Sequence, residues 1–366
     1  MNILREWRAS IEDIESPRDE RARILWRRVA IPGLDRHSSR GLIMLAPLEA
    51  VQRPGHGPEV LHVVGVPVTP EHIEHVLWTA ELTAAFGSLL TFAAGHRIEA
   101  FEEWPVTDQG GETIFMSLGH MSDKRLEAPS GGDLIEKLNE LVDRITHLDE
   151  DSARVVLAAL QLHYGACVLA PVSPTSAYMS IVAGIEALSR EFGNPPHEWS
   201  AWDMAGRWDR FMAEADLSAD QAEMLRARLM KDQHMRLAET FGEYASTRLP
   251  ESFWTDEHFD WIYVGDGRGG HLPGYEQSRY HFSESVPTDR RTLKACLKES
   301  YRLRSQFVHT GESEVTYLTP MSTRKHETDP SVHADGAPKK SAPLPFAALR
   351  SILTSLISAE LDAGTS

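Results

Sequence analysis

Residues 290–311 have the sequence RRTLKACLKESYRLRSQFVHTG, which decides the fold expected for the C-terminal half of the chain. The preceding Pro287-Thr288-Asp289 is typical of a helix N-cap, and Gly311 is placed to take the left-handed conformation that ends a helix. Apolar side chains recur at helical spacing and predict a core-packing face: Leu293, Cys296, Leu297, Leu303 and Phe307. The stretch therefore predicts an amphipathic helix.

Basic side chains cover the rest of this helix. Residues 290–309 carry six basic side chains and one acidic one, a balance of +5 in a chain whose formal net charge is −17. Four of them recur at every fourth position, and we call them the basic stripe: Arg290, Lys294, Lys298 and Arg302. A solvated helix face and a phosphate-binding face both account for the stripe, and the pattern alone leaves the two interpretations open.

Arg304 and His309 lie near the end of the same predicted helix. The free carbonyls and the dipole at a helix C-terminus favour a protonated imidazole. An arginine that neutralises a phosphate, beside a histidine that transfers protons, suits phosphate-ester chemistry. Arg304 and His309 are five positions apart, so on a regular helix their side chains point about 140° away from each other. For the two side chains to act together, either the last turn is distorted or the long arginine side chain reaches around the helix.

The fold class that we expect is an α+β N-terminal domain over residues 1–128, followed by a mostly α-helical bundle over residues 132–362. The boundary lies in the turn-forming residues 128–132. Within the first domain, residues 1–30 are charge-rich and helical in pattern. Other expected strands lie at 41–47, 60–68, 98–106 and 112–118, and other expected helices at 69–95, 133–148, 152–170, 176–192, 218–249 and 346–361. Residues 250–286 are expected to be a loop with at most one short strand, and residues 322–345 a linker or disordered insertion.

Composition excludes several classes of protein. The chain has 366 residues, enough for two domains, and its acidity excludes a general nucleic-acid coat, so any RNA contact must be local. The two cysteines exclude a disulfide scaffold, and we expect both in the core. No histidine spacing indicates a metal site, and Gly265–Gly270 is not followed by the helix start that a dinucleotide site needs. No signal peptide or membrane span is evident, so we expect a cytoplasmic protein with no membrane partner.

Two segments resemble the Apea-like group of the HEPN domain family. Leu303–Gly311 is similar to its R-x4-H segment, which ends in a histidine near glycine, and Ser176–Leu188 resembles an earlier helix of the group that ends in Glu-Ala-Leu. The order of helices up to the last one also matches, so the resemblance covers about residues 132–362. Ser305 differs from the Asn, Asp or His that often follows the arginine in the wider family.

The resemblance implies a metal-independent endoribonuclease that leaves 2′,3′-cyclic phosphate and 5′-OH ends. His309 would be the general acid or base and Arg304 would stabilise charge on the phosphate, with Glu186 and Ser305 in supporting roles. The basic stripe would bind RNA, no cofactor is needed, and a homodimer is expected. Such a hydrolase would act as a phage-defence or toxin effector, with the N-terminal domain as a sensor. The alternative is a non-catalytic HEPN module that dimerises or binds nucleic acid or protein.

Overall fold

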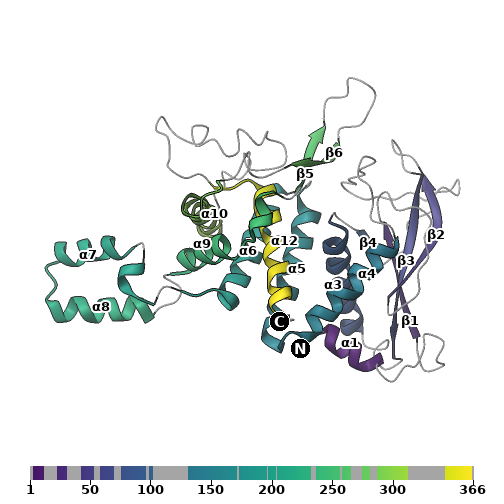
Figure 1. Cartoon of the computed structure of the whole chain (residues 1–366), viewed down its shortest axis with the longest axis horizontal. Helices are drawn as coiled ribbons and strands as arrows, with labels where there is room; N and C mark the ends of the chain where they lie inside the picture. Colours follow the sequence, from purple (N-terminus) through teal and green to yellow (C-terminus); the bar gives the residue numbers. More distant parts are fainter. Residues whose placement is uncertain are drawn as a thin grey trace.

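A computed structural model of the chain describes most of the predicted helices and part of the N-terminal region (Figure 1). The described residues are mostly helical, as expected of a helical bundle. They are 3–11, 23–30, 43–52, 58–69, 76–95, 99–101, 131–170, 173–195, 197–202, 204–231, 236–255, 258–264, 274–280, 287–311 and 343–364.

Among the described N-terminal residues, four antiparallel strands pair in the order β2-β3-β1-β4. Their bounds are β1 Arg23–Ala30, β2 Met44–Gln52, β3 Pro58–Val68 and β4 Glu99–Phe101. The helical pattern inferred for residues 1–30 is wrong for β1, which pairs along its whole length with β3. The expected strand at 112–118 lies outside the described residues, and a separate α+β domain over 1–128 stays a prediction.

Helix α1 (Ile3–Ile11) joins this part to the helices. The Trp7 indole is fully buried, donates a hydrogen bond to the Pro67 carbonyl over 2.7 Å and packs edge-on against Phe86 of α3 (Val76–Ala94). Arg8 pairs with Asp143 of α4 (Gly131–His147). One hydrophobic core therefore runs without interruption from α1 to the last helix of the chain.

The bundle is built around α5 (Glu150–Leu169), which packs against α3, α6 (Pro174–Phe192) and α12 (Phe346–Ala363). Helix α6 in turn contacts α9 (Leu237–Arg248) and α10 (Arg290–Thr310). Figure 1 shows α12, in yellow, beside α6 and α5, so the end of the chain closes the bundle. The final helix predicted at 346–361 is thus a core helix.

Residues 197–286 differ most from the sequence-based expectation. The single helix expected at 218–249 is two helices, α8 (Ala219–Lys231) and α9, and α7 (Ala205–Glu214) was not anticipated. Helices α7 and α8 project from the body of the molecule and have a small core of their own (Figure 1). Residues 250–286, expected to be a loop with at most one short strand, contain a 3-10 turn at Glu251–Trp254 and a hairpin of β5 (His258–Val264) and β6 (Gly274–Tyr280). Paired strands satisfy their backbone groups through each other, a gain that a single segment does not reveal.

Among the described residues, only α5 is long and apolar enough to cross a membrane. A core helix of a soluble protein has the same length and composition, and α5 packs against α3, α6 and α12. The contacts of α5 are thus those of a helix inside the bundle, and the cytoplasmic location stays a prediction.

Candidate functional site

Both ends of α10 have the local structure that the sequence predicts. The Asp289 side chain accepts a hydrogen bond from the Thr292 backbone N–H over 2.8 Å at the N-terminus. Gly311 has a φ of 72° at the C-terminus, and its N–H donates to the Phe307 carbonyl over 2.8 Å. The predicted core face is buried at Leu293, Cys296, Leu297 and Leu303, and Phe307 is half-buried. Both cysteines are buried, as expected.

The middle of the basic stripe faces α9. Glu239, which is buried in α9, forms ion pairs with Lys294 and, over 2.7 Å, with Lys298. Glu243 forms a further ion pair with Lys294 over 2.7 Å. The two helices approach closely at Gly242, where an added Cβ would lie 2.9 Å from Cγ of Lys298 and 3.1 Å from the Lys294 carbonyl oxygen.

The expectation that the stripe forms one outward face is therefore wrong for Lys294 and Lys298, whose side chains are 25% and 23% exposed. The physical reason is the buried carboxylate of Glu239, which requires cationic partners once it is removed from water. Arg290 and Arg302 remain about 60% exposed. Arg290 pairs with the exposed Glu251, and Arg302 pairs with the partly buried Glu299. RNA binding by the stripe stays a prediction, and the exposed ends are its accessible part.

Arg304 points towards α6 and meets a buried carboxylate there. Its Nη2 atom lies 3.3 Å from Oε2 of Glu186, whose side chain is only 5% exposed. Arg190, one turn further along α6, pairs with Oε1 of the same carboxylate over 2.5 Å. Burial, and then the Glu186 carboxylate, raise the pKa of the neighbouring Tyr301. We call Glu186, Arg190, Tyr301 and Arg304 the Glu186 cluster.

His309 lies in the last turn of α10, and its side chain is exposed. The helix remains regular to Thr310, so no distortion of the last turn brings His309 round to the face of Arg304. Within the described ranges, the His309 ring has no hydrogen bond or ion pair. The neighbouring Val308 is 59% exposed, an unusual exposure for a large apolar side chain, and Ser305 is half-buried.

The structure thus joins two of the sequence-predicted residues, Arg304 and Glu186, and shows no partner for His309 among the residues that it describes. Sequence reasoning missed Arg190 and Tyr301. The spacing of Glu186 and Arg190 is a signal that was available, because oppositely charged residues four apart on a helix are neighbours. Tyr301 had no such signal, since its contact with Glu186 crosses between two helices.

Among the described residues, no group of three or more His, Cys, Asp and Glu side chains is arranged to hold a metal ion. The Gly265–Gly270 segment lies outside those residues. Comparison with known proteins finds no matching family model, no matching curated protein and no matching solved structure. The assignment of function therefore depends on the residues of this chain and on the resemblance of its two segments.

Proposed function

We propose that the chain is a metal-independent endoribonuclease of the HEPN type, acting as a homodimer in phage defence or as a toxin. The observation that supports this most is the exposed His309 in the last turn of α10, about one and a half turns after an arginine that a buried carboxylate orients. The exposed imidazole is accessible to a large substrate.

The reaction needs one proton removed and one delivered. The ribose 2′-oxygen loses its proton and attacks the adjacent phosphorus, and the bond from phosphorus to the 5′-oxygen breaks. The departing 5′-oxygen takes a proton, which leaves a 2′,3′-cyclic phosphate and a 5′-OH. One His309 would act as the base and a second as the acid, while Arg304 stabilises the negative charge that develops on the phosphate.

Two copies of the chain are needed for this scheme. A single chain offers one His309 and one Arg304 that face different sides of α10, whereas a two-fold dimer places two of each around one cleft. The exposed Val308 beside His309 supplies an apolar contact for such an interface. Glu186 is then a positioning residue, because it holds the Arg304 guanidinium at the surface of α6.

One observation favours the alternative, a non-catalytic helical module for dimerisation or binding. Arg304 is already paired within the chain, and each member of the basic stripe has a carboxylate partner. Cations that are neutralised in this way contribute less to RNA binding than free ones. In this alternative, the Glu186 cluster is a structural contact between α6 and α10.

Incubation of the purified chain with total RNA in EDTA, followed by analysis of the RNA ends, separates the two functions. We expect cyclic phosphate and 5′-OH ends from the parent and at least a hundredfold loss of rate in His309→Ala, the range typical of a general acid or base. His147→Ala is the matched control, because His147 is also an exposed histidine in the last turn of a helix. No cleavage by the parent, or equal cleavage by both variants, would support the module.

A further inference from the structure

Two arginines of the Glu186 cluster contact opposite oxygens of one buried carboxylate. Nη2 of Arg190 lies 2.5 Å from Oε1 of Glu186, and Nη2 of Arg304 lies 3.3 Å from Oε2. Arg190 belongs to α6 and Arg304 to α10, so the contact joins two helices. Since the two oxygens belong to one planar group, the carboxylate holds the two guanidinium groups next to each other.

Tyr301 provides independent evidence that the two guanidinium groups are close together. Burial raises the pKa of its phenol most strongly, followed by the negative charge of Glu186, and the positive charges of Arg304 and Arg190 both act in the opposite direction. One hydroxyl group is therefore within electrostatic range of both arginines. The Tyr301 ring packs against the fully buried Phe241 ring, with centroids 5.3 Å apart, which limits the movement of this side of the cluster.

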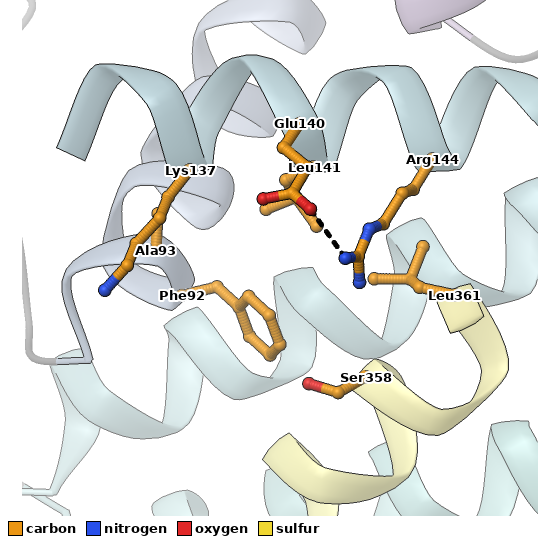
Figure 2. Close-up of a pocket in the computed structure, with 8 residues that line it drawn as sticks. All are labelled: Phe92, Ala93, Lys137, Glu140, Leu141, Arg144, Ser358 and Leu361. Carbon is orange, nitrogen blue, oxygen red and sulfur yellow. Dashed lines mark hydrogen bonds and ion pairs between the residues drawn. The ribbon is translucent and has the colours of Figure 1, made fainter. Parts of the chain in front are cut away.

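The pairing of charges in this cluster is the reverse of that at the hollow between α3, α4 and α12 (Figure 2). There, Arg144 donates to Glu140, four residues before it, and to Asp362, each over 2.6 Å, so one arginine has two carboxylate partners. Glu186 and Arg190 have the same spacing along α6, but this carboxylate serves two arginines. A guanidinium group has five N–H donors, and a contact through one Nη2 atom leaves others for a ligand.

Both arginines also reach the solvent. The Arg190 side chain is 51% exposed and the Arg304 side chain is 28% exposed, whereas Glu186 is buried. The carboxylate therefore lies on the inner side of the cluster, and the guanidinium groups lie towards its outer side. A phosphodiester has two non-bridging oxygens that share one negative charge, and two adjacent guanidinium groups can donate to both of them.

We propose that Arg190 is a second phosphate-binding residue of the site, and that a phosphodiester of bound RNA lies between Arg190 and Arg304. This inference rests on the proposed ribonuclease function and adds a residue that the spacing of Arg304 and His309 does not indicate. Each guanidinium group donates to one non-bridging oxygen, while Glu186 orients both groups from the buried side. Because the phosphate gains negative charge when the 2′-oxygen attacks, the second arginine also stabilises the transition state.

Binding of a 2′-O-methyl RNA oligonucleotide to the full chain tests the proposal without cleavage, because this RNA lacks the attacking hydroxyl. Fluorescence anisotropy measures its Kd at several salt concentrations. Arg190→Gln should raise the Kd roughly tenfold, the effect of losing one charge-assisted contact, and should reduce the slope of log K against log salt by about one. Arg144→Gln is the matched control and should change neither, since Arg144 also follows a glutamate by four residues and also pairs with a second helix.

Arg190→Lys separates the charge from the shape of the side chain. Lysine keeps the positive charge and the pair with Glu186 but lacks the planar fork of the guanidinium group. This variant should therefore keep the salt slope of the parent and raise the Kd, though less than Arg190→Gln does. Circular dichroism shows which variants are folded.

The proposal is overturned if folded Arg190→Gln binds this RNA with the Kd and salt slope of the parent. It is also overturned if the parent shows no binding at about 0.1 mM, the weak end of non-specific affinities. If Arg190→Gln does not fold, an equal Kd for Arg190→Lys and the parent overturns it instead.

The outcome is distinguishable from that of the ribonuclease test. Binding that depends on Arg190, in a chain that cleaves no RNA, would support the phosphate site and remove the catalytic function. Cleavage that depends on His309, with unchanged binding by Arg190→Gln, would support the catalytic function and overturn the role of Arg190.

Discussion

The Arg304 guanidinium in α10 lies 3.3 Å from the Glu186 carboxylate in α6, and only 5% of the Glu186 side chain is exposed. A buried carboxylate is stable only with cationic or hydrogen-bonding partners, which Arg304 and Arg190 supply. The pair therefore fixes the direction of the arginine that we propose as catalytic. It also links the two segments that carry the resemblance to HEPN domains.

Glu186→Gln should lower the free energy of unfolding by about 1–3 kcal/mol, because two arginines lose their shared carboxylate and a buried group loses charge-assisted hydrogen bonds. Urea unfolding measures the change. Glu191→Gln, at an exposed position on the same helix, is the control and should change stability by less than about 0.5 kcal/mol. If both variants are equally stable, the ion pair contributes nothing to the packing of α6 on α10.

A mixture of His309→Ala and Arg304→Ala chains should recover part of the RNA cleavage that each variant lacks. In a two-fold dimer, the mixed pair places one intact His309 and one intact Arg304 at the shared cleft, whereas either variant alone lacks one group entirely. Light scattering checks that both variants are dimers. Cleavage by a monomeric parent at micromolar concentration would contradict a composite site.

The exposed ends of the basic stripe should contribute more to RNA binding than its middle. Arg290→Gln with Arg302→Gln should reduce the slope of log K against log salt by up to about two, since each lost phosphate contact removes about one. Lys294→Gln with Lys298→Gln should leave the slope nearly unchanged and lower stability, because Glu239 then has no cationic partner. If the lysine double variant instead reduces the slope more than the arginine double variant, the two lysines leave Glu239 to bind RNA.

Gly242→Ala should destabilise the fold by about 1–3 kcal/mol, the usual cost of overpacking. The new Cβ would lie 2.9 Å from Lys298 Cγ and 3.1 Å from backbone of α10, so α9 and α10 must separate. Gly165→Ala is the control, since it lies inside α5 with no atom within 4 Å of its Cβ position, and it should stabilise by up to about 1 kcal/mol. Thermal unfolding measures the Tm of each variant. A change of Tm in the same direction for both variants would refute the close contact between α9 and α10.

The free energy of unfolding should decrease as the pH falls below 6.5, because the buried His163 resists protonation in the folded chain. Burial of the ring, with a further contribution from the positive charge of Arg350, lowers the pKa of His163 to about 3 from an ordinary value of 6.5. Below pH 6.5 the unfolded chain therefore binds a proton that the folded chain does not, so stability is lost between pH 6.5 and 3, by about 1.4 kcal/mol per pH unit at most. His163→Gln should remove this part of the slope in urea unfolding between pH 6.5 and 4.5, and an unchanged slope would show that the ring is not buried as a neutral group.

Local features of the bundle could be predicted from the sequence. The Asp289 cap, the left-handed Gly311 and the buried face of α10 depend on interactions between residues three or four apart, and such patterns are present in the sequence itself. The same holds for α4, α5, α6 and α12, whose apolar stripes predicted their positions within a few residues. The spacing of Arg304 and His309 likewise predicted their positions near the end of one helix.

Features that depend on distant partners could not be predicted in this way. The strands β5 and β6 pair across residues 265–273, and neither segment shows its partner from its own composition. Helix α8 ends at Lys231 although the pattern of charges continues into α9. In the hairpin, the stabilising contacts are made between segments that are separated along the chain, and not between neighbouring residues.

By itself, the sequence determined that α10 is an amphipathic helix with a positive charge balance and a histidine in its last turn. Only the tertiary structure decided what each cation meets. Lys298 pairs with Glu239, which is 59 residues away along the chain, and Arg304 turns to Glu186 while His309 stays in solvent. The physical reason is that helical periodicity sets the angle of a side chain around its own axis, whereas the packing of α10 on α9 and α6 decides whether that angle leads to water or to a buried carboxylate.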